Sequence, residues 1–419
     1  MNAACAEAVI AGENTVVGST DSVPLRAGAL KVLLVQHCAA LSGSTISGHL
    51  IARGMREAGS PVDVAFGFDG PCRALYDEIG CRTHVVPHKN WLRAKRWDRS
   101  LRCIAAERRR AREFERLIQQ TKPDVVYVNS IVSLAAAIAA KRVGVPCVWH
   151  IRELFEDVGG EMQIPAFGGR RLVRRYLRRY ADRLVAISHA VVENVIGDDR
   201  DVTLIPNAVA DEFFEFKLSR SEARATLRLP TEGRIVGVPG TLRPVKGHPF
   251  FLKAAAQVAV MHPNCRFAMT GDGPDAYHRQ LLDEADDLGL AGRIDWLGTT
   301  QDMPAFYRAC DLVCVPSASE SFGRTAIEAF ACGTPVIASA VGGLKETIED
   351  GSNGLLVEYG NVAGLAGAMS RLLTDEELRE RLSVAARGDA EEKFTEVRYQ
   401  AAVSNVVSDV ALSPASVEA

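Results

Sequence analysis

Two glutamates in SESFGRTAIEAFACGTPVIAS, residues 319–339, have a type and a spacing that could do chemistry. The preceding DLVCVPS indicates a buried strand, SESFG a loop, and RTAIEAFAC a helix that stops at Gly333. Glu320 would then lie in a loop at the carboxyl end of a strand, and Glu328 one turn inside the helix. Together they could accept hydrogen bonds from separate hydroxyl groups of one extended ligand, such as a sugar or a ribose. The alternative is that both are solvated charges favoured by the helix dipole.

The same half of the chain contains features that could bind an anion. Backbone amides near Phe322, Gly323 and Arg324 begin the predicted helix, and a helix N-terminus is a natural anion site. Arg243 and Lys246, in GTLRPVKG, follow an earlier strand and could neutralise a pyrophosphate. Surface arginines and lysines are common, so the basic pair alone is a weak signal. Because the basic pair lies in the same predicted domain as a helix N-terminus that could bind an anion, the two signals together are much more specific.

The elements that must position these residues indicate two α/β domains. Residues 31–59 and 234–259 each begin with an apolar strand, a loop of small residues and a helical pattern. Strands alternate with helices throughout, which predicts two Rossmann-like domains with parallel sheets facing a deep cleft. Functional loops should lie at the carboxyl ends of the strands.

The predicted boundaries divide the chain into four parts. They are a loose tail at 1–28, a first domain at 29–207, a second domain at 208–395, and a C-terminal helix and tail at 396–419. The final helix could complete the second domain or cross back to the first.

Composition limits the classes of protein to consider. The chain has 419 residues, 47% of them apolar and 24% charged, which is ordinary for a soluble globular protein with two cores. Its net charge of −3 gives no global attraction to nucleic acid.

Ten cysteines are scattered along the chain without a C-x-x-C pair, which favours free thiols in a reducing cytoplasm. The spacing of Cys310 and Cys314 fits core packing better than a zinc site. The first 28 residues lack a basic start followed by an apolar block, so they are not expected to act as a secretory signal. The sequence has no apolar run of roughly 18 residues, so any membrane contact is expected to be peripheral.

The second half resembles the donor domain of retaining glycosyltransferases with the GT-B fold, specifically glycosyltransferase family 4. The matching motifs, over about residues 235–358, are GTLRPVKG, TGDGP, RIDWLG, ESFGRTAIEAFACGTPVIAS, VGGLKETI and GSNGLLV. The first half is similar to the acceptor domain through SGSTISGH, WHIRE and ADRLVAIS. The resemblance implies transfer of a sugar, with retention, from a nucleotide diphosphate sugar to an acceptor hydroxyl. UDP is the favoured nucleotide, and no cofactor or essential metal is expected.

The resemblance also implies roles for individual residues. Glu320 would bind donor-sugar hydroxyls and Glu328 the ribose hydroxyls, while Arg243 and Lys246 would bind the diphosphate. The other expected donor-binding residues are Gly43, Gly240, Gly271, Gly298, Ser321, Phe322, Gly323, Arg324 and Thr325. The expected catalytic residues are His150, Arg243, Lys246 and Glu320, and the expected acceptor-binding residues are Ser42, Ser44, Arg152 and Glu153. His150 would reach the transferred sugar, although a lone histidine at a strand end is more often structural.

Two departures from the family pattern concern specificity. Many relatives have a Gly-Gly pair in the first loop, where this chain has Ser42, Gly43 and Ser44. Arg324 stands where relatives often have an aliphatic residue, and it could select an acidic sugar or form an outward salt bridge.

Parts of the sequence are also compatible with other functions. Gly271, Gly273 and Ala276 fit G-x-G-x-x-A, and Asp295 follows about twenty residues later, which is typical of an NAD-dependent oxidoreductase. That fingerprint normally opens its domain, whereas here it comes some forty residues after the domain begins. A catalytically silent scaffold with the same fold is another alternative, as is a nucleotide-sugar epimerase or phosphorylase.

Basic segments are concentrated in the first half. Residues 89–117 contain eleven Lys and Arg against four acids, and residues 170–183 contain seven Arg and one Asp. They could be solvated helix faces, a peripheral contact with the inner face of a membrane, or a site for an anionic acceptor. The single D-x-D, Asp199 to Asp201, lies in a polar stretch, and no metal is assigned to it.

Overall fold

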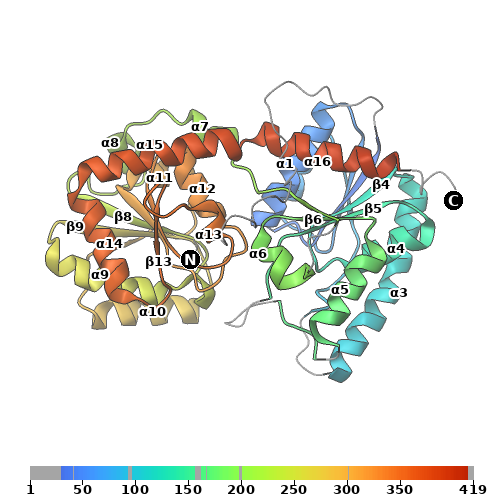
Figure 1. The fold of residues 1–419 in the computed structure, drawn as a ribbon, viewed down its shortest axis with the longest axis horizontal. Helices are drawn as coiled ribbons and strands as arrows, with labels where there is room; N and C mark the ends of the chain where they lie inside the picture. The colour runs from blue at the N-terminus through green and yellow to red at the C-terminus, as the bar shows by residue number, and fades with distance from the viewer. Residues whose placement is uncertain are drawn as a thin grey trace, which may run out of the picture.

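Two lobes, each built from a sheet and its covering helices, lie side by side (Figure 1). The computed structural model describes residues 30–40, 42–92, 97–155, 162–166, 168–197, 201–300 and 302–413. Every pair of named strands in these ranges is parallel. The prediction of two Rossmann-like domains is therefore confirmed. The nine cysteines within these ranges are all free.

The first domain contains a seven-stranded sheet of order β3-β2-β1-β4-β5-β6-β7. Its strands are β1 Val32–Gln36, β2 Val62–Phe66, β3 Arg82–Val85, β4 Val125–Val128, β5 Cys147–Ile151, β6 Arg183–Ala186 and β7 Val202–Leu204. Its helices are α1 Gly43–Glu57, α2 Arg73–Glu78, α3 Trp97–Thr121, α4 Leu134–Val143, α5 Gly169–Tyr180 and α6 His189–Val191, followed by a π-helical turn at Val192–Ile196.

The second domain contains a six-stranded sheet of order β10-β9-β8-β11-β12-β13. Its strands are β8 Arg234–Pro239, β9 Cys265–Thr270, β10 Ile294–Trp296, β11 Leu312–Val315, β12 Val336–Ser339 and β13 Leu355–Val357. The helices are α7 Asp211–Glu215, α8 Arg220–Thr226, the 3₁₀ turn η2 Pro244–Lys246, α9 His248–Met261, α10 Asp275–Asp287, α11 Met303–Ala309, α12 Arg324–Ala331, α13 Leu344–Thr347, α14 Val362–Thr374 and α15 Glu376–Lys393.

The strands form because short apolar runs can be buried on both faces. All residues of β1, β4, β5, β11 and β12 are buried, as expected for parallel sheets covered by helices. One apolar cluster, which includes Trp149, Leu177, Tyr307 and Phe330, extends through both domains. Separate clusters fill the other face of each sheet. The two domains therefore share packed surface on one side.

The C-terminal helix α16, Glu396–Ala411, crosses back to the first domain, where it packs against α1, β4 and β5 (Figure 1). The chain leaves the first domain beside this crossing, because the Val209 amide donates to the Phe394 carbonyl oxygen at 2.8 Å. The Asp211 amide also donates to the Glu396 carboxylate at 3.0 Å. The two connections between the domains therefore run side by side.

Candidate functional site

The loop between β11 and α12 carries Glu320 to the carboxyl edge of the second sheet. Its end requires glycine at position 323, which has φ +94° and serves as the N-cap of α12. A Cβ there would overlap the side chain of Leu344. On the other side, a Cβ at Gly342 would overlap the Glu320 carbonyl oxygen, and the Gly343 amide donates to that oxygen at 2.9 Å. The VGG segment therefore fixes the backbone that presents Glu320.

The Glu320 carboxylate is paired with one of the predicted phosphate-binding cations. Its Oε2 lies 2.8 Å from Lys246 Nζ and 3.2 Å from Ser317 Oγ. Lys246 reaches it from η2, which Arg243 caps at its start. The close approach depends on Gly247, where φ is +71° and a Cβ would overlap the Pro316 carbonyl oxygen. Two loops far apart in the sequence thus bring opposite charges together.

Glu328 is held from two sides inside α12. Its Oε1 lies 2.9 Å from Arg324 Nε, and its Oε2 accepts a hydrogen bond from the Tyr307 hydroxyl at 2.8 Å. Burial, and then the nearby Glu328 carboxylate, raise the pKa of Tyr307 well above its usual range, so this hydroxyl stays a proton donor. Arg324 also donates from Nη1 to the Gly43 carbonyl oxygen at 3.2 Å. Arg324 therefore forms a salt bridge within its own helix, and its guanidinium also donates a hydrogen bond to the first domain.

The predicted donor glycines bring neighbouring strand ends together. Gly240, Gly271 and Gly298 have φ angles of +134°, +126° and +61°. The Gly271 amide donates to the Gly298 carbonyl oxygen at 2.7 Å, and a Cβ at Gly271 would overlap the Gly240 carbonyl oxygen. These loops after β8, β9 and β10 therefore pack with little space for side chains.

Three other predicted donor residues lie around the start of α12. The Ser321 carbonyl oxygen accepts a hydrogen bond from Ser188 Oγ of the first domain at 2.6 Å. Phe322 is buried, and its ring meets that of Phe394 edge to face at 5.8 Å. Thr325 is half-buried in the first turn. Phe322 thus packs inside the protein, and any ligand contact from it would come through its backbone.

The first loop of the first domain lies opposite α12. Ser42 caps α1 by accepting from the Thr45 amide at 3.2 Å, and its hydroxyl lies 3.1 Å from that of Ser44. The Ser44 carbonyl oxygen accepts from Asn129 at 3.0 Å. The structure therefore brings Ser42, Gly43 and Ser44 next to the predicted donor site.

The WHIRE residues are largely covered in this structure. His150 is fully buried on β5, where its Nδ1 lies 2.8 Å from the Tyr127 hydroxyl. Burial, together with the Arg152 charge, lowers its pKa well below the usual range. Its ring is covered in this structure and its Nε2 has no hydrogen-bond partner, so the expected contact with a transferred sugar stays a prediction. Sequence showed the strand end but not which face of the strand is covered.

Arg152 and Glu153 also face inward. Arg152 donates to Asn129 and Asn207 at 2.6 Å each and also bonds to the Tyr399 hydroxyl of α16. Glu153 accepts from buried backbone and hydroxyl groups of residues 130 and 131, and burial raises its pKa. Both side chains have structural partners in this structure, and their expected role in acceptor binding stays a prediction.

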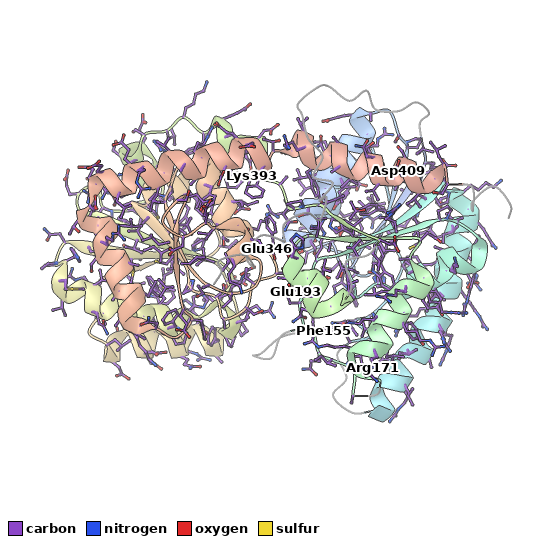
Figure 2. All side chains as sticks on the ribbon, viewed as in Figure 1. Phe155, Arg171, Glu193, Glu346, Lys393 and Asp409 are labelled. Atoms are coloured by element: carbon purple, nitrogen blue, oxygen red, sulfur yellow. The ribbon has the colours of Figure 1, made fainter. Side chains whose placement is uncertain are left out.

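A cavity of about 660 Å³ lies between the domains, next to the Glu320 loop. Its charged lining contains three cations, Arg170, Arg174 and Lys345, and two carboxylates, Glu193 and Glu346. Figure 2 shows Glu193 and Glu346 on the two sides of the domain junction. Glu346 accepts from the amides of residues 189 and 190, at 2.7 Å each. Sequence analysis missed this cavity, although VGGLKETI and the arginine-rich segment each contribute to its wall.

The arginine-rich helix α5 has one buried and one charged face. Its buried residues are Val173, Tyr176, Leu177 and Tyr180. Five of its arginines are Arg171, Arg174, Arg175, Arg178 and Arg179, which surround a second hollow beside Gly197. Arg171 lies near the outer end of the helix (Figure 2). Arg108 of α3 donates to the Tyr176 hydroxyl at 3.2 Å, so α3 reaches the buried face of α5.

The dinucleotide alternative is weakened by the placement of its acidic residue. Asp295 forms a two-pronged ion pair with Arg266, with oxygen-to-nitrogen distances of 2.8 and 2.6 Å. Gly271 also follows β9, a strand that comes after the first strand of its domain. A ribose would therefore have to compete with a bidentate arginine for this carboxylate.

Among the described residues, no group of three His, Cys, Asp or Glu side chains could hold a metal ion. Of the D-x-D segment, only Asp201 lies within the described ranges. No helix in those ranges is long and apolar enough to cross a membrane.

Comparisons with protein families agree with the two-domain division. Residues 42–208 match the model "Glycosyl transferase 4-like domain", and residues 219–389 match "Glycosyl transferases group 1". The chain is 31% identical over 294 residues to a D-inositol 3-phosphate glycosyltransferase from Stackebrandtia nassauensis, with 63% of each chain covered. It is 42% identical over 164 residues to the enzyme of that name from Mycolicibacterium smegmatis, covering 38% of this chain and 37% of that one. The chain thus spans less than two thirds of these curated relatives.

Solved structures share the fold at low sequence identity. The Anabaena protein HepE, in complex with UDP-glucose, has a TM-score of 0.78 and 24% identity, covering 91% of this chain and all of that one. WaaG, a glycosyltransferase of lipopolysaccharide biosynthesis, has a TM-score of 0.68 and 16% identity, covering 90% of this chain and 99% of that one.

Proposed function

Because the chain belongs to the group 1 glycosyltransferases, which have the two-domain GT-B fold, we propose that it transfers a sugar from a nucleotide diphosphate sugar to an acceptor hydroxyl. The observation that carries this proposal is the convergence of Glu320 with Lys246 and of Glu328 with Arg324 at one sheet edge. Carboxylates suit sugar and ribose hydroxyls, and cations suit phosphates. UDP is the first nucleotide to test, because structural neighbours are described with UDP and UDP-glucose.

The proposed reaction is a retaining transfer without an essential metal. The bond from the sugar anomeric carbon to the diphosphate oxygen breaks, and a bond to the acceptor oxygen forms on the same face. The acceptor proton passes to the leaving phosphate, so the products are a glycoside and a nucleoside diphosphate. Arg243, Lys246 and the N-terminus of α12 would stabilise the charge that grows on the leaving group, which is electrostatic catalysis. No carboxylate is assigned as a nucleophile.

The cavity between the domains supports an acceptor that carries an anionic group beside its hydroxyl. Arg170, Arg174 and Lys345 outnumber the two carboxylates of its lining. The curated relatives are named for a phosphorylated acceptor. We therefore expect D-inositol 3-phosphate to accept sugar better than unphosphorylated inositol. The Arg174→Ala variant should lose that preference, and an unchanged preference would remove this residue from the acceptor site.

The exposed arginines of α5 support a further proposal of peripheral contact with an anionic lipid surface. Clusters of arginine near a membrane gain roughly 1 kcal/mol per residue from anionic lipids. In vesicle sedimentation, the double variant Arg171→Glu/Arg175→Glu should bind phosphatidylglycerol vesicles much more weakly than the wild type. The matched control is Lys253→Glu/Arg279→Glu on the second domain. Equal loss in both variants would show that only net charge matters.

Calorimetric titration of UDP, GDP, ADP and NAD without metal tests the donor assignment. One nucleoside diphosphate should bind preferentially, and Lys246→Ala should weaken it. A transfer assay with the matching sugar donors, monitored by nuclear magnetic resonance, would then check retention at the anomeric carbon. Binding of NAD alone would favour the oxidoreductase alternative. Binding of none of the four would contradict the proposed donor site.

A further inference from the structure

One charged side chain contacts both a predicted ribose-binding carboxylate and the opposite domain. Arg324, the first residue of α12, places Nε 2.9 Å from Glu328 Oε1. Its Nη1 donates to the Gly43 carbonyl oxygen at 3.2 Å, across 281 positions of sequence. The side chains of Arg324 and Glu328 are only 18% and 10% exposed, so salt screens their pairing less than it would at an open surface.

The Glu328 carboxylate can keep its present contacts when a ligand arrives. An ionised carboxylate offers about four lone-pair positions on its two oxygens. The Tyr307 hydroxyl uses one on Oε2, while Arg324 lies 2.9 Å from Oε1 as an ion pair whose Nε–H is not aligned for a hydrogen bond. Ribose hydroxyls would therefore meet a carboxylate that is already oriented from two sides, and both orienting groups would stay in place.

The other end of the arginine holds the start of α1. Gly43 is the first residue of this helix, Ser42 is its cap, and the Ile46 amide closes the first turn on the Ser42 carbonyl oxygen at 3.0 Å. A hydrogen bond from the second domain to Gly43 therefore acts on a turn of the acceptor domain. Tyr307 offers a contrast, because it orients the same carboxylate from within its own domain.

We propose that Arg324 is a positioning residue that couples the donor carboxylate Glu328 to the first loop of the acceptor domain. This inference rests on the proposed function, since it assumes that Glu328 receives the donor ribose. A guanidinium is planar and carries five donors, so it can hold two acceptors at once. A lysine at this position could still pair with Glu328, four residues further along the helix, but would release Gly43.

Three variants separate the two contacts: Arg324→Lys, Arg324→Met and the matched control Tyr307→Phe. The readouts are UDP affinity by calorimetry and amide hydrogen exchange in a peptide covering residues 42–50, with and without UDP. Arg324→Lys should keep UDP affinity within about threefold, yet the loop amides should exchange on the order of 10-fold faster. Arg324→Met should lose both affinity and protection. Tyr307→Phe should weaken UDP binding and leave the loop protection unchanged.

A failure of the proposed coupling can be told apart from a failure of the proposed donor site. If UDP, GDP and ADP all fail to bind the wild-type protein, the proposed function fails, whatever the loop does. If UDP binds the wild type and loop exchange in Arg324→Lys and Arg324→Met matches the wild type, the coupling is refuted. Loop protection that is lost equally in Tyr307→Phe would also refute it, because the effect would then come from Glu328 alone.

Discussion

Removing the charge of Lys246 is the perturbation with the most direct expected result. Lys246→Met keeps most of the side-chain stem but removes the ammonium, which lies 2.8 Å from Glu320 Oε2. The lysine side chain is 25% exposed and that of Glu320 is 14% exposed, so the pair is partly shielded. The free energy of unfolding should change by less than about 1 kcal/mol, because such pairs contribute little to folding.

The effect on turnover should be much larger. Losing one group that stabilises a developing anion typically costs about 2.7–4 kcal/mol, or roughly 100- to 1000-fold in kcat. The change also removes the cation that pairs with the Glu320 carboxylate. The carboxylate then keeps only its hydrogen bond from the Ser317 hydroxyl, 3.2 Å away. That carboxylate would repel the donor diphosphate. Adding Glu320→Gln to Lys246→Met should therefore recover UDP affinity by on the order of 10-fold, while turnover stays low.

The assay compares UDP affinity and steady-state transfer in the wild type, the single variant and the double variant. The matched control is Lys253→Met, which removes an exposed lysine of α9 whose carboxylate partner, Glu284, is 4.0 Å away. This control should behave as the wild type does. A kcat for Lys246→Met within about threefold of the wild type would refute the phosphate role. A double variant that binds UDP less well than the single one would refute the charge argument.

Three further perturbations test the site and its support. Glu328→Ala should weaken UDP binding by roughly 10-fold or more, and unchanged affinity would contradict the ribose role. Gly342→Ala should lower kcat because its Cβ would displace the Glu320 backbone, whereas Gly367→Ala, in open space within α14, should keep activity and stabilise the protein by up to about 1 kcal/mol. Burial lowers the pKa of His88 to about 4, so the folded state binds fewer protons than the unfolded state between pH 6.5 and 4. Stability should therefore fall as pH drops through this window, with about 2 kcal/mol between pH 7 and 5 due to His88, and His88→Gln should flatten that slope in denaturant titrations.

The fold and the loops of the proposed donor site were predictable because they follow from local patterns. Apolar runs such as DLVCVPS can only be satisfied as buried strands, and alternation with helices makes those strands parallel. The glycine at 323 then separates loop from helix, which puts Glu320 and Glu328 at one sheet edge. Local rules of this kind act over a few residues, so a single sequence was sufficient.

The same rules could not show which face of a strand is covered. His150 and Arg152 lie where WHIRE ends a strand, a position that predicts access to a cleft. In the structure, Arg152 is bound to Tyr399 of α16, which packs on that part of the sheet. Whether α16 crosses back was left open by the sequence. The burial of His150 and Arg152 was therefore decided by a helix that lies some 250 residues further along the chain.

By itself, the sequence determined two parallel α/β domains, a basic loop, and two carboxylates on a loop and a helix at a strand end. Only the tertiary structure decided the partners of those charges: Lys246 for Glu320, and Arg324 with Tyr307 for Glu328. It also decided that Arg324 reaches Gly43 and that cations from both domains line one cavity. The physical reason is that hydrophobic periodicity fixes the type of each element, whereas ion pairs and hydrogen bonds depend on distances set by packing of the whole chain.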